Sequence, residues 1–290
     1  MSEHKLKIGA IDAVRVIMNP LDFNNPDLIL NYEVLKILFK WNCVHVFIRE
    51  YGNVYWDIKF RKSLIESIKE MLKRKDKKKM KPITDNFDIV NMFEKRLAKF
   101  AGSKYAVAVD SCTHAIHLCL EWEKLKDLPK YHITLPSRTY VSVPMQCINA
   151  GFKIEFKDIE WQDRYFIEPY HIIDAAGCFY KDMFCDFESY QFCISFGSKK
   201  PFALGKGGMI FTDNFRAYKW LKFASFDGRD RHKGVMEDTF ESIGWHYQMI
   251  PEVAAQGLVK FNMGQYVEGS AHYHYYRNIS KLPCFKDYLI

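Results

Sequence analysis

Residues 105–125 read YAVAVDSCTHAIHLCLEWEKL, a strand-like segment that leads directly into a helix-like one. The beginning of this stretch, YAVAVD (105–110), is short and mostly apolar, as in a buried strand. In the rest, Ala115, Leu118, Cys119 and Trp122 recur at helical spacing, which predicts an amphipathic helix. A strand followed at once by a helix is typical of α/β domains, so the stretch favours that class.

The same alternation continues on both sides of this stretch. Helices are expected at IVNMFEKRLAKFAG (89–102) and VSVPMQCINAG (141–151). Strands are expected at HITLP (132–136), KIEFKDI (153–159), HIIDAA (171–176), QFCISF (191–196) and GGMIFTD (207–213). We therefore predict an α/β domain with a mostly parallel sheet and helices on both faces. Ligands of such sheets bind beyond the carboxyl ends of the strands, so residues there are the first candidates for chemistry.

A basic run at residues 73–81, followed by Pro82, divides the chain into two expected domains. Residues 1–81 are predicted to form a small N-terminal α/β unit of unknown role, and residues 82–290 the main domain. The evidence for the small unit is helical periodicity at 26–40 and 61–74 and a possible hairpin turn at Gly52-Asn53.

Charge and composition limit the class of protein. The 290-residue chain has a net charge of +7, much of it in the basic run. Such a run fits either an anionic-polymer site or a solvated helix end. The second interpretation is favoured because the run lacks aromatic residues for stacking, so we do not expect a nucleic-acid partner.

The cysteines and the apolar runs point to a cytoplasmic protein. None of the eight cysteines forms a CxxC pair, so no metal site is expected, and reduced thiols fit a reducing compartment. No apolar run reaches the roughly 18–20 residues that span a bilayer, and MSEHKLKIGAID lacks the pattern of a signal peptide. No membrane partner is therefore expected.

Two strand ends carry groups suited to a phosphate and a flat ring. Ser111-Cys112-Thr113 opens the helix after YAVAVD, where free backbone N–H groups and hydroxyls can bind an anion. The alternative is that the serine or threonine only caps the helix. Tyr140 follows HITLP and can stack on a ring, unless it is an ordinary core tyrosine.

Two further strand ends carry an acid and an amine. Asp174 ends an apolar strand, where a carboxylate is costly to bury unless it meets a cation such as a protonated pyridine nitrogen. The alternative is that Asp174 caps a helix or forms one half of a buried salt bridge. In SFGSKK, a lysine just past a strand can become an imine-forming nucleophile, whereas the alternative is a pair of surface lysines. Together these groups match the needs of pyridoxal phosphate.

Residues 83–265 resemble the DegT-type (DegT/DnrJ/StrS) sugar aminotransferases. The resemblance implies an aspartate-aminotransferase-like, three-layer α/β domain of fold type I, with pyridoxal phosphate as the cofactor. It rests on blocks found in the family's order: FEKRLAKFAGSKYAVAVDSCTHAIHLCL, PSRTYVSVPMQCINAGFKIEFKDIE, IIDAAG, SFGSKKPFALGKGGMIFTD, LKFASFDGR and GWHYQMIPEVAAQG.

The resemblance assigns roles at the ring of the cofactor. Lys200, rather than Lys199, matches the Schiff-base lysine and would move the proton between substrate carbon and cofactor. Asp174 matches the acid that keeps the pyridine nitrogen protonated, and Tyr140 matches the ring-stacking aromatic.

It also assigns roles at the phosphate. Ser111, Cys112 and Thr113 match the phosphate-binding turn, and Ser195 matches a further phosphate ligand. His246 lies where the family often has an asparagine that reaches the phosphate of the partner subunit. A homodimer is implied on the same basis.

Three departures from the family pattern bear on activity. Gly177 stands where the family has a glutamine or histidine, and Cys112 replaces the glycine of the phosphate turn. Relative to the family, the chain is expected to be shortened after GLVKF (257–261) and extended at the N-terminus.

The resemblance implies an aminotransferase that moves an amino group, with glutamate as donor, to a keto group of a nucleotide-linked sugar in polysaccharide biosynthesis. The departures keep open an alternative, a shortened member that binds the cofactor but is non-catalytic or does other chemistry. A third hypothesis, resting on charge alone, is an anionic-polymer-binding protein that uses residues 73–81.

Overall fold

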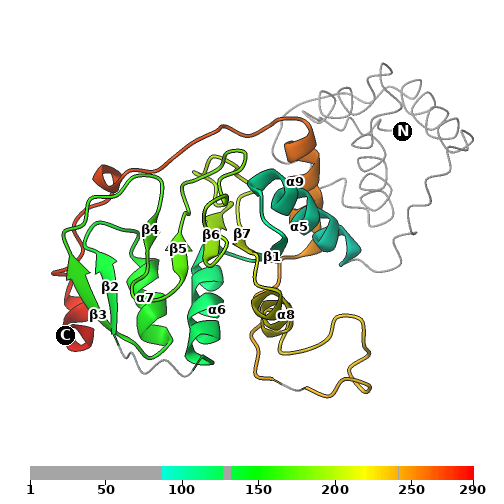
Figure 1. Ribbon diagram of the computed structural model, residues 1–290, viewed down its shortest axis with the longest axis horizontal. Helices are drawn as coiled ribbons and strands as arrows, with labels where there is room; N and C mark the ends of the chain where they lie inside the picture. Colours follow the sequence, from blue (N-terminus) through cyan, green and yellow to red (C-terminus); the bar gives the residue numbers. More distant parts are fainter. Residues whose placement is uncertain (1–86, 127–131, 241) are drawn as a thin grey trace, which may run out of the picture. The chain divides into compact units, whose positions relative to one another are not determined.

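The computed structural model describes residues 87–126, 132–240 and 242–290 (Figure 1). The expected N-terminal unit, residues 1–81, lies outside the described residues together with its hairpin, its helices and the basic run at 73–81. The division at residues 81 and 82 therefore stays a prediction.

The described chain alternates between strands and helices, as expected from the sequence. The helices are α5 (Asp88–Ala101), α6 (Cys112–Lys124), α7 (Ser142–Asn149), α8 (Phe215–Ala224) and α9 (Pro251–Asn262), with 3-10 turns η1 (Tyr273–Tyr275) and η2 (Pro283–Tyr288). The strands are β1 (Tyr105–Val109), β2 (His132–Pro136), β3 (Lys153–Lys157), β4 (Tyr165–Phe166), β5 (Ile172–Asp174), β6 (Gln191–Ser195) and β7 (Gly208–Thr212). Every strand expected in the main domain is present, and β4 was not foreseen.

The main sheet is mixed, with strand order β1-β7-β6-β5-β4. Strand β7 runs antiparallel to both β1 and β6, so those two strands share one direction, and β5 is parallel to β6. The short β4 is antiparallel to β5, while β2 and β3 form a separate parallel pair. The α/β class is confirmed. The reversal of β7 arises because a loop at residues 196–207, rather than a helix, joins it to β6.

Helix α6 lies against one face of this sheet (Figure 1). On its inner side, Ile116 and Leu118 are fully buried in a cluster with Cys193 of β6 and Ile210 of β7. Each such aliphatic side chain contributes about 1.5–3 kcal/mol by leaving water. The packing of α6 therefore fixes its first turn close to the ends of the central strands.

The other face of the sheet carries aromatic side chains. Phe192 alternates with Cys193 along β6, so it points to the opposite face, where its ring contacts Phe184. Phe93 of α5 contacts Phe196, directly after β6, with ring centroids 5.5 Å apart. The expectation of helices on both faces is thus met by α6 and α5.

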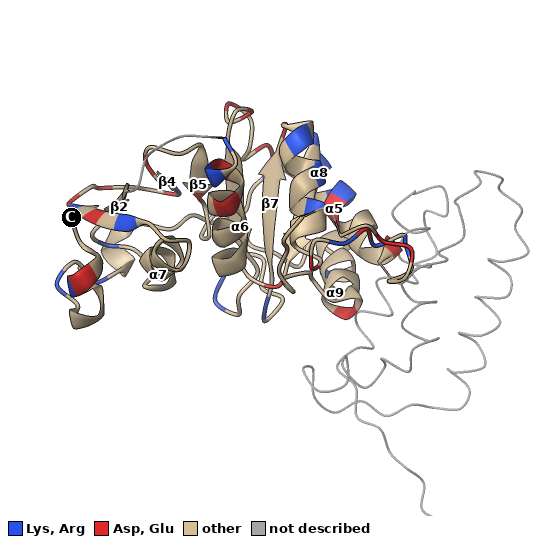
Figure 2. Cartoon of the chain, turned by 90° about the horizontal axis from the view of Figure 1, so that it is seen from below, with Lys and Arg blue, Asp and Glu red and all other residues tan. Residues whose placement is uncertain are grey.

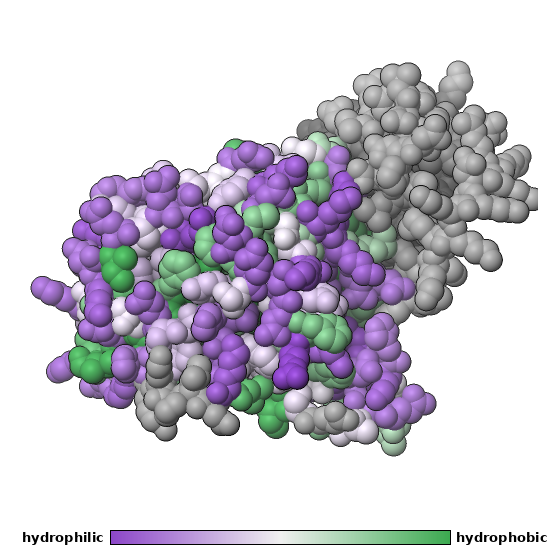
Figure 3. Space-filling view, viewed as in Figure 1, coloured by the Kyte–Doolittle hydropathy of each residue, from purple (hydrophilic) through white to green (hydrophobic). Residues whose placement is uncertain are grey.

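Two central strands of the sheet, β6 and β7, carry no charged residue. Strand β7 carries none, whereas α8 carries several lysines and arginines (Figure 2). The face seen in Figure 3 is mainly hydrophilic, with hydrophobic residues in separate patches. Within residues 87–126, 132–240 and 242–290, no helix is both long and apolar enough to cross a bilayer.

Candidate active site

The start of α6 touches the start of β7, and this contact brings two parts of the site together. A Cβ placed on Gly208 would lie 2.4 Å from the backbone N of Cys112 and 2.6 Å from the backbone C of Ser111. Only glycine permits such an approach without displacing backbone. Because Gly208 also pairs with Ser195 of β6, the predicted phosphate turn and Ser195 meet at this point.

The predicted phosphate-binding residues lie around this contact. Ser111 caps α6, since its Oγ accepts from the N–H of His114 at 3.2 Å. Thr113 Oγ1 is 2.9 Å from Ser142 Oγ at the start of α7, and Ser195 Oγ accepts from the N–H of Gly197 at 3.2 Å. The cap considered as the alternative is therefore present. It does not exclude the anion site, because the first N–H groups of a helix lack intrahelical acceptors.

A charged cluster that sequence reasoning missed flanks the same turn. Asp110 Oδ1 lies 2.6 Å from His114 Nδ1, and Asp110 Oδ2 lies 3.2 Å from Lys206 Nζ. The His114 ring stacks on Tyr247, with centroids 3.7 Å apart. Partial burial opposes ionisation of Asp110, but the bonds from His114 and Lys206 hold its pKa below the ordinary value. The sequence did contain a signal for this cluster, because Asp110 and His114 are four residues apart at the start of a helix, a spacing at which side chains meet.

Asp174 is shielded from solvent at the carboxyl end of β5. Its side chain is buried, the Tyr165 hydroxyl donates to Oδ2 at 2.5 Å, and the N–H of Ala176 donates to Oδ1 at 2.9 Å. Burial raises the pKa of Asp174 above its ordinary value, although these bonds and Lys200 act in the other direction. Among the described residues, no lysine, arginine or histidine forms an ion pair with it. The expected salt-bridge alternative is thus not found there.

Tyr165 and Thr139 extend this hydrogen-bonded group. Thr139 Oγ1 lies 2.5 Å from the Tyr165 hydroxyl, which in turn donates to Asp174. Burial and the neighbouring carboxyl raise the pKa of Tyr165 well above its ordinary value, so the hydroxyl stays a donor. Sequence reasoning could not find Tyr165, because its strand has two residues and its pairing with β5 is not visible locally.

The two lysines after β6 differ in their surroundings. Lys199 is exposed, whereas Lys200 is half-buried and its N–H donates to the carbonyl of Gly197 at 2.9 Å. Burial raises the pKa of the Cys112 thiol well above its ordinary value, Asp174 adds to that rise, and Lys200 opposes it. Lys200 is thus near enough to Asp174 and Cys112 for its charge to lower the pKa of both groups, whereas Lys199, which the resemblance does not select, is exposed to solvent.

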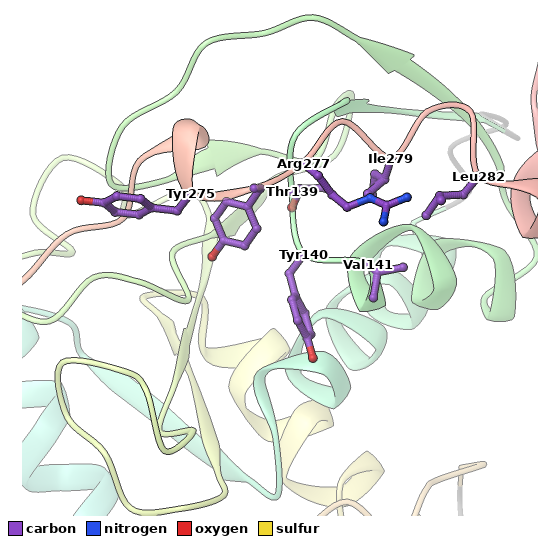
Figure 4. A pocket seen from close by; sticks show the side chains of 8 residues that line it. Thr139, Tyr140, Val141, Tyr275, Arg277, Ile279 and Leu282 are labelled. Atoms are coloured by element: carbon purple, nitrogen blue, oxygen red, sulfur yellow. The ribbon is translucent and has the colours of Figure 1, made fainter.

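Tyr140 borders an open cavity of about 370 Å³ (Figure 4). Its side chain is 59% exposed, so it is not the core tyrosine considered as the alternative. An accessible ring is what stacking requires. The cavity is also lined by Thr139, Val141, Tyr275, Tyr276, Arg277, Ile279 and Leu282.

His246 is the one predicted site residue that the described structure does not bring to this group. It is exposed, its Nδ1 lies 2.9 Å from Asp227 Oδ2, and its Nε2 lies 3.2 Å from Gln248 Nε2. Its neighbour Tyr247 accepts from the N–H of Asp110 at 2.8 Å, so His246 is one residue from the α6 end of the site. A role toward a partner subunit stays a prediction.

Gly177 is packed too tightly to carry a side chain. A Cβ there would lie 2.2 Å from Cβ of Ala271 and 3.1 Å from its backbone N. Glycine in place of the family's glutamine or histidine is therefore explained by packing, because Ala271, far away in the sequence, fills the space that a side chain at position 177 would need.

This chain belongs to the DegT/DnrJ/EryC1/StrS aminotransferase family, whose model matches residues 66–176 and 172–266, more than half of the 290 residues. Pyridoxal phosphate is the cofactor of that family. No curated protein is matched by the sequence.

Solved structures support the same fold. A putative PLP-dependent aminotransferase from Bacillus cereus ATCC 10987 is 21% identical, with a TM-score of 0.51, over 62% of this chain and 59% of that one. AtS13 from Actinomadura melliaura is 18% identical, with a TM-score of 0.50, over 61% and 59%. The sugar aminotransferase CalS13 from Micromonospora echinospora is 15% identical, with a TM-score of 0.50, over 61% and 60%. The chain thus covers about three-fifths of each of these structures.

The residues of the site fit pyridoxal phosphate. The hydroxyls of Thr113 and Ser195 and the start of α6 supply donors for a phosphate, and buried Asp174 supplies an acceptor for a protonated ring nitrogen. The side chain of Lys200 carries a primary amine, the group that covalent attachment of this cofactor requires. In the part of the chain that the structure describes, no group of three or more His, Cys, Asp or Glu side chains is arranged to hold a metal ion.

Proposed function

We propose that this chain binds pyridoxal phosphate and transfers an amino group, from glutamate, to a keto group of a nucleotide-linked sugar. The proposal includes the cytoplasmic location and the role in polysaccharide biosynthesis that the resemblance implies. Family membership and the fold of sugar aminotransferases support it.

The observation that carries the proposal is the environment of Asp174. A buried carboxyl with a raised pKa and no ion-pair partner among the described residues is costly, and a protonated ring nitrogen offsets that cost. Tyr165 and the N–H of Ala176 hold both carboxylate oxygens in place. An acid kept in this way favours the positively charged form of the ring.

The other residues of the site have separate roles in binding the cofactor and in moving the proton. Pyridoxal phosphate, when bound, supplies an electron sink for the negative charge that develops on the amino-bearing carbon. Lys200 Nζ would hold the cofactor and, once free, would carry the proton to and from that carbon. Tyr140 covers the ring, while Thr113, Ser195 and the α6 start bind the phosphate.

The proposal also includes a homodimer in which His246 reaches the phosphate site of the partner subunit. Its exposure and its position next to Tyr247 are compatible with that role. Analytical ultracentrifugation of the His246→Ala and wild-type chains, with and without cofactor, tests the dimer and its dependence on this residue.

Absorbance spectroscopy with borohydride tests the cofactor part of the proposal. The wild-type chain mixed with pyridoxal phosphate should show a visible band that borohydride removes, leaving the cofactor bonded to Lys200 in mass spectra. Lys200→Ala should lose the band and Lys199→Ala should keep it. A wild-type chain that never acquires the band contradicts the proposal.

Half-reactions test the transfer itself. Glutamate should convert the band to that of the amine form, and keto nucleotide sugars should restore it, with the aminated product found by mass. The tight packing of Gly177 against Ala271 favours one competing function, a member that binds the cofactor without transferring the amine. A borohydride-sensitive band that glutamate leaves unchanged supports that competitor and refutes transfer from glutamate.

A further inference from the structure

Residues 265–290 pass the carboxyl ends of β6 and β5 and continue to β3, and we call them the crossing segment. In Figure 1 they run in orange and red from α9 past β6, β5 and β4 toward β3. The N–H of Val267 donates to the carbonyl of Pro201 at 3.0 Å, directly after Lys200. Further along, the N–H of Ile279 donates to the carbonyl of Ser137 at 2.9 Å, close to Tyr140. The segment therefore joins the lysine loop to the Tyr140 loop.

Between these points the segment is held next to the end of β5. Phe179 and Gly269 exchange backbone hydrogen bonds of 3.1 and 3.2 Å, and the carbonyl of Ala271 accepts from the N–H of Asp163 at 2.6 Å. The contact of Ala271 with Gly177 leaves no room for a side chain at position 177. The segment is thus fixed by backbone bonds and close packing on both sides of Asp174.

Tyr276 is the residue of the crossing segment whose ring contacts lead toward Asp174. Its ring centroid is 5.5 Å from that of Trp161, which is 5.0 Å from the ring of Tyr165, the donor to Asp174. Its carbonyl accepts from Arg138 Nη1 at 3.2 Å, and its side chain lines the cavity beside Tyr140. These contacts fix the backbone and one face of the ring.

The electrostatic surroundings of Tyr276 agree with this placement. Burial, followed by Asp174, Cys112 and Tyr140, raises the pKa of Tyr276 to about 12. Its hydroxyl therefore stays protonated at neutral pH and remains a hydrogen-bond donor. The three groups that act on it come from the end of β5, the start of α6 and the loop before α7, so Tyr276 borders the space that they share.

We propose that Tyr276 is a further cofactor-contacting residue, which binds the ring of pyridoxal phosphate from the crossing segment. The inference rests on the proposed function, because it assumes that the cofactor occupies the space between Asp174 and Tyr140. A ligand in that space meets Tyr276, whose side chain lines the cavity beside Tyr140. The crossing segment then serves as a wall of the cofactor site and not only as a connection.

Cofactor titration of Tyr276→Phe tests the inference, with Tyr288→Phe as the matched control. Both tyrosines lie on the crossing segment, but Tyr288 is exposed and lies 5.9 Å, ring centroid to Nζ, from Lys153, away from the site. Dissociation constants are measured for pyridoxal phosphate and for pyridoxal, which lacks the phosphate. Loss of one hydrogen bond to the ring should weaken both ligands by about tenfold in Tyr276→Phe. Tyr288→Phe should match the wild type.

Circular dichroism of the bound cofactor supplies a second measurement. Tyr276→Phe should reduce the visible signal at saturating cofactor, because the ring is less firmly oriented. Gly177→Ala should do the same with Tyr276 intact, since the added methyl group displaces Ala271. This second variant keeps the test valid if Tyr276→Phe fails to fold.

The outcomes separate the two proposals. Failure of the wild type to bind either ligand refutes the proposed function, and the inference with it. A wild type that binds, together with Tyr276→Phe constants within about twofold of those of Tyr288→Phe and an unchanged dichroism signal, refutes only the inference. Weakened binding of pyridoxal phosphate with unchanged binding of pyridoxal also refutes it, because the contact is then with the phosphate.

Discussion

The two ends of the candidate site, the start of α6 and the end of β5, each hold a carboxyl group, but in opposite electrostatic surroundings. At the start of α6, Asp110 is partly exposed and is paired with His114 and Lys206. At the end of β5, Asp174 is buried and has only neutral donors, Tyr165 and the N–H of Ala176. One carboxyl has a lowered pKa and the other a raised one.

This difference separates two kinds of binding. The α6 end is already neutralised and solvated, so a phosphate there exchanges water for hydrogen bonds at modest gain. At the β5 end, keeping the buried carboxyl of Asp174 charged is costly in free energy, and a positively charged ring offsets that cost. Most of the selectivity for such a ring is therefore expected at this end.

The largest effect is expected at the buried end, from Asp174→Asn. The change keeps the shape but removes the charge that pairs with the ring nitrogen. We expect the affinity for pyridoxal phosphate to fall by about a hundredfold or more, as when one partner of a buried ion pair is removed. Fluorescence titration measures the fall, and an affinity within a few-fold of the wild type would remove the distinction between the two ends.

The same variant should change how stability depends on pH in the cofactor-free protein. The pKa of Asp174 is raised in the folded state, whereas an unfolded aspartate has a pKa of about 3.9. The folded state then binds the proton more tightly, so its stability falls as the pH rises from about 4 through the raised pKa. Asp174→Asn lacks this loss and should gain stability at pH 7 but not below pH 4. Urea unfolding at both pH values checks the slope, and parallel curves for the two chains would contradict it.

A smaller effect is expected at the joint between the start of α6 and β7, from Gly208→Ala. The added Cβ meets backbone atoms of Cys112 and Ser111, which side-chain rotation cannot relieve. Overpacking of this kind costs about 1–3 kcal/mol. Thermal unfolding measures it, with Gly197→Ala as the control, because a Cβ there has only ordinary contacts of 3.5 and 3.7 Å. Equal stability of the two variants would show that the joint is not tight.

Ser111→Ala should affect only the α6 end of the site. The change removes the cap on the N–H of His114, which costs about 1 kcal/mol. It should also weaken pyridoxal phosphate more than pyridoxal, since only the former has a phosphate. Equal weakening of both ligands would place Ser111 at the ring instead.

The smallest effect is expected from Lys206→Ala. Its side chain is 71% exposed, and exposed ion pairs contribute about 0–1 kcal/mol. Any loss of phosphate affinity should shrink as salt is raised, because salt screens exposed charges. A loss that is independent of salt would mean that Lys206 acts from a buried position in the bound state.

Local patterns foresaw the strands and the principal helices, but not the contacts that complete the site. HITLP and QFCISF carry their own strand signals, and the polar residues at their ends were found on that basis. The reversal of β7 depends on how the loop at 196–207 turns, and Tyr165 reaches Asp174 through the long-range pairing of β4 with β5. The crossing segment has no periodic pattern, and its backbone bonds to Pro201, Phe179 and Ser137 join residues far apart in sequence.

The contact of Gly208 with the start of α6 has a consequence for how the chain is made. The segment YAVAVDSCTHAIHL leaves the ribosome well before residue 208, so the phosphate turn exists as sequence long before its packing partner. Until β7 arrives, Val107 and Val109 of β1 lack the strand that pairs with them. Non-local pairings of this kind slow folding and expose apolar surface meanwhile. The nascent first half is thus expected to keep apolar residues of β1 unpaired until β7 has been made.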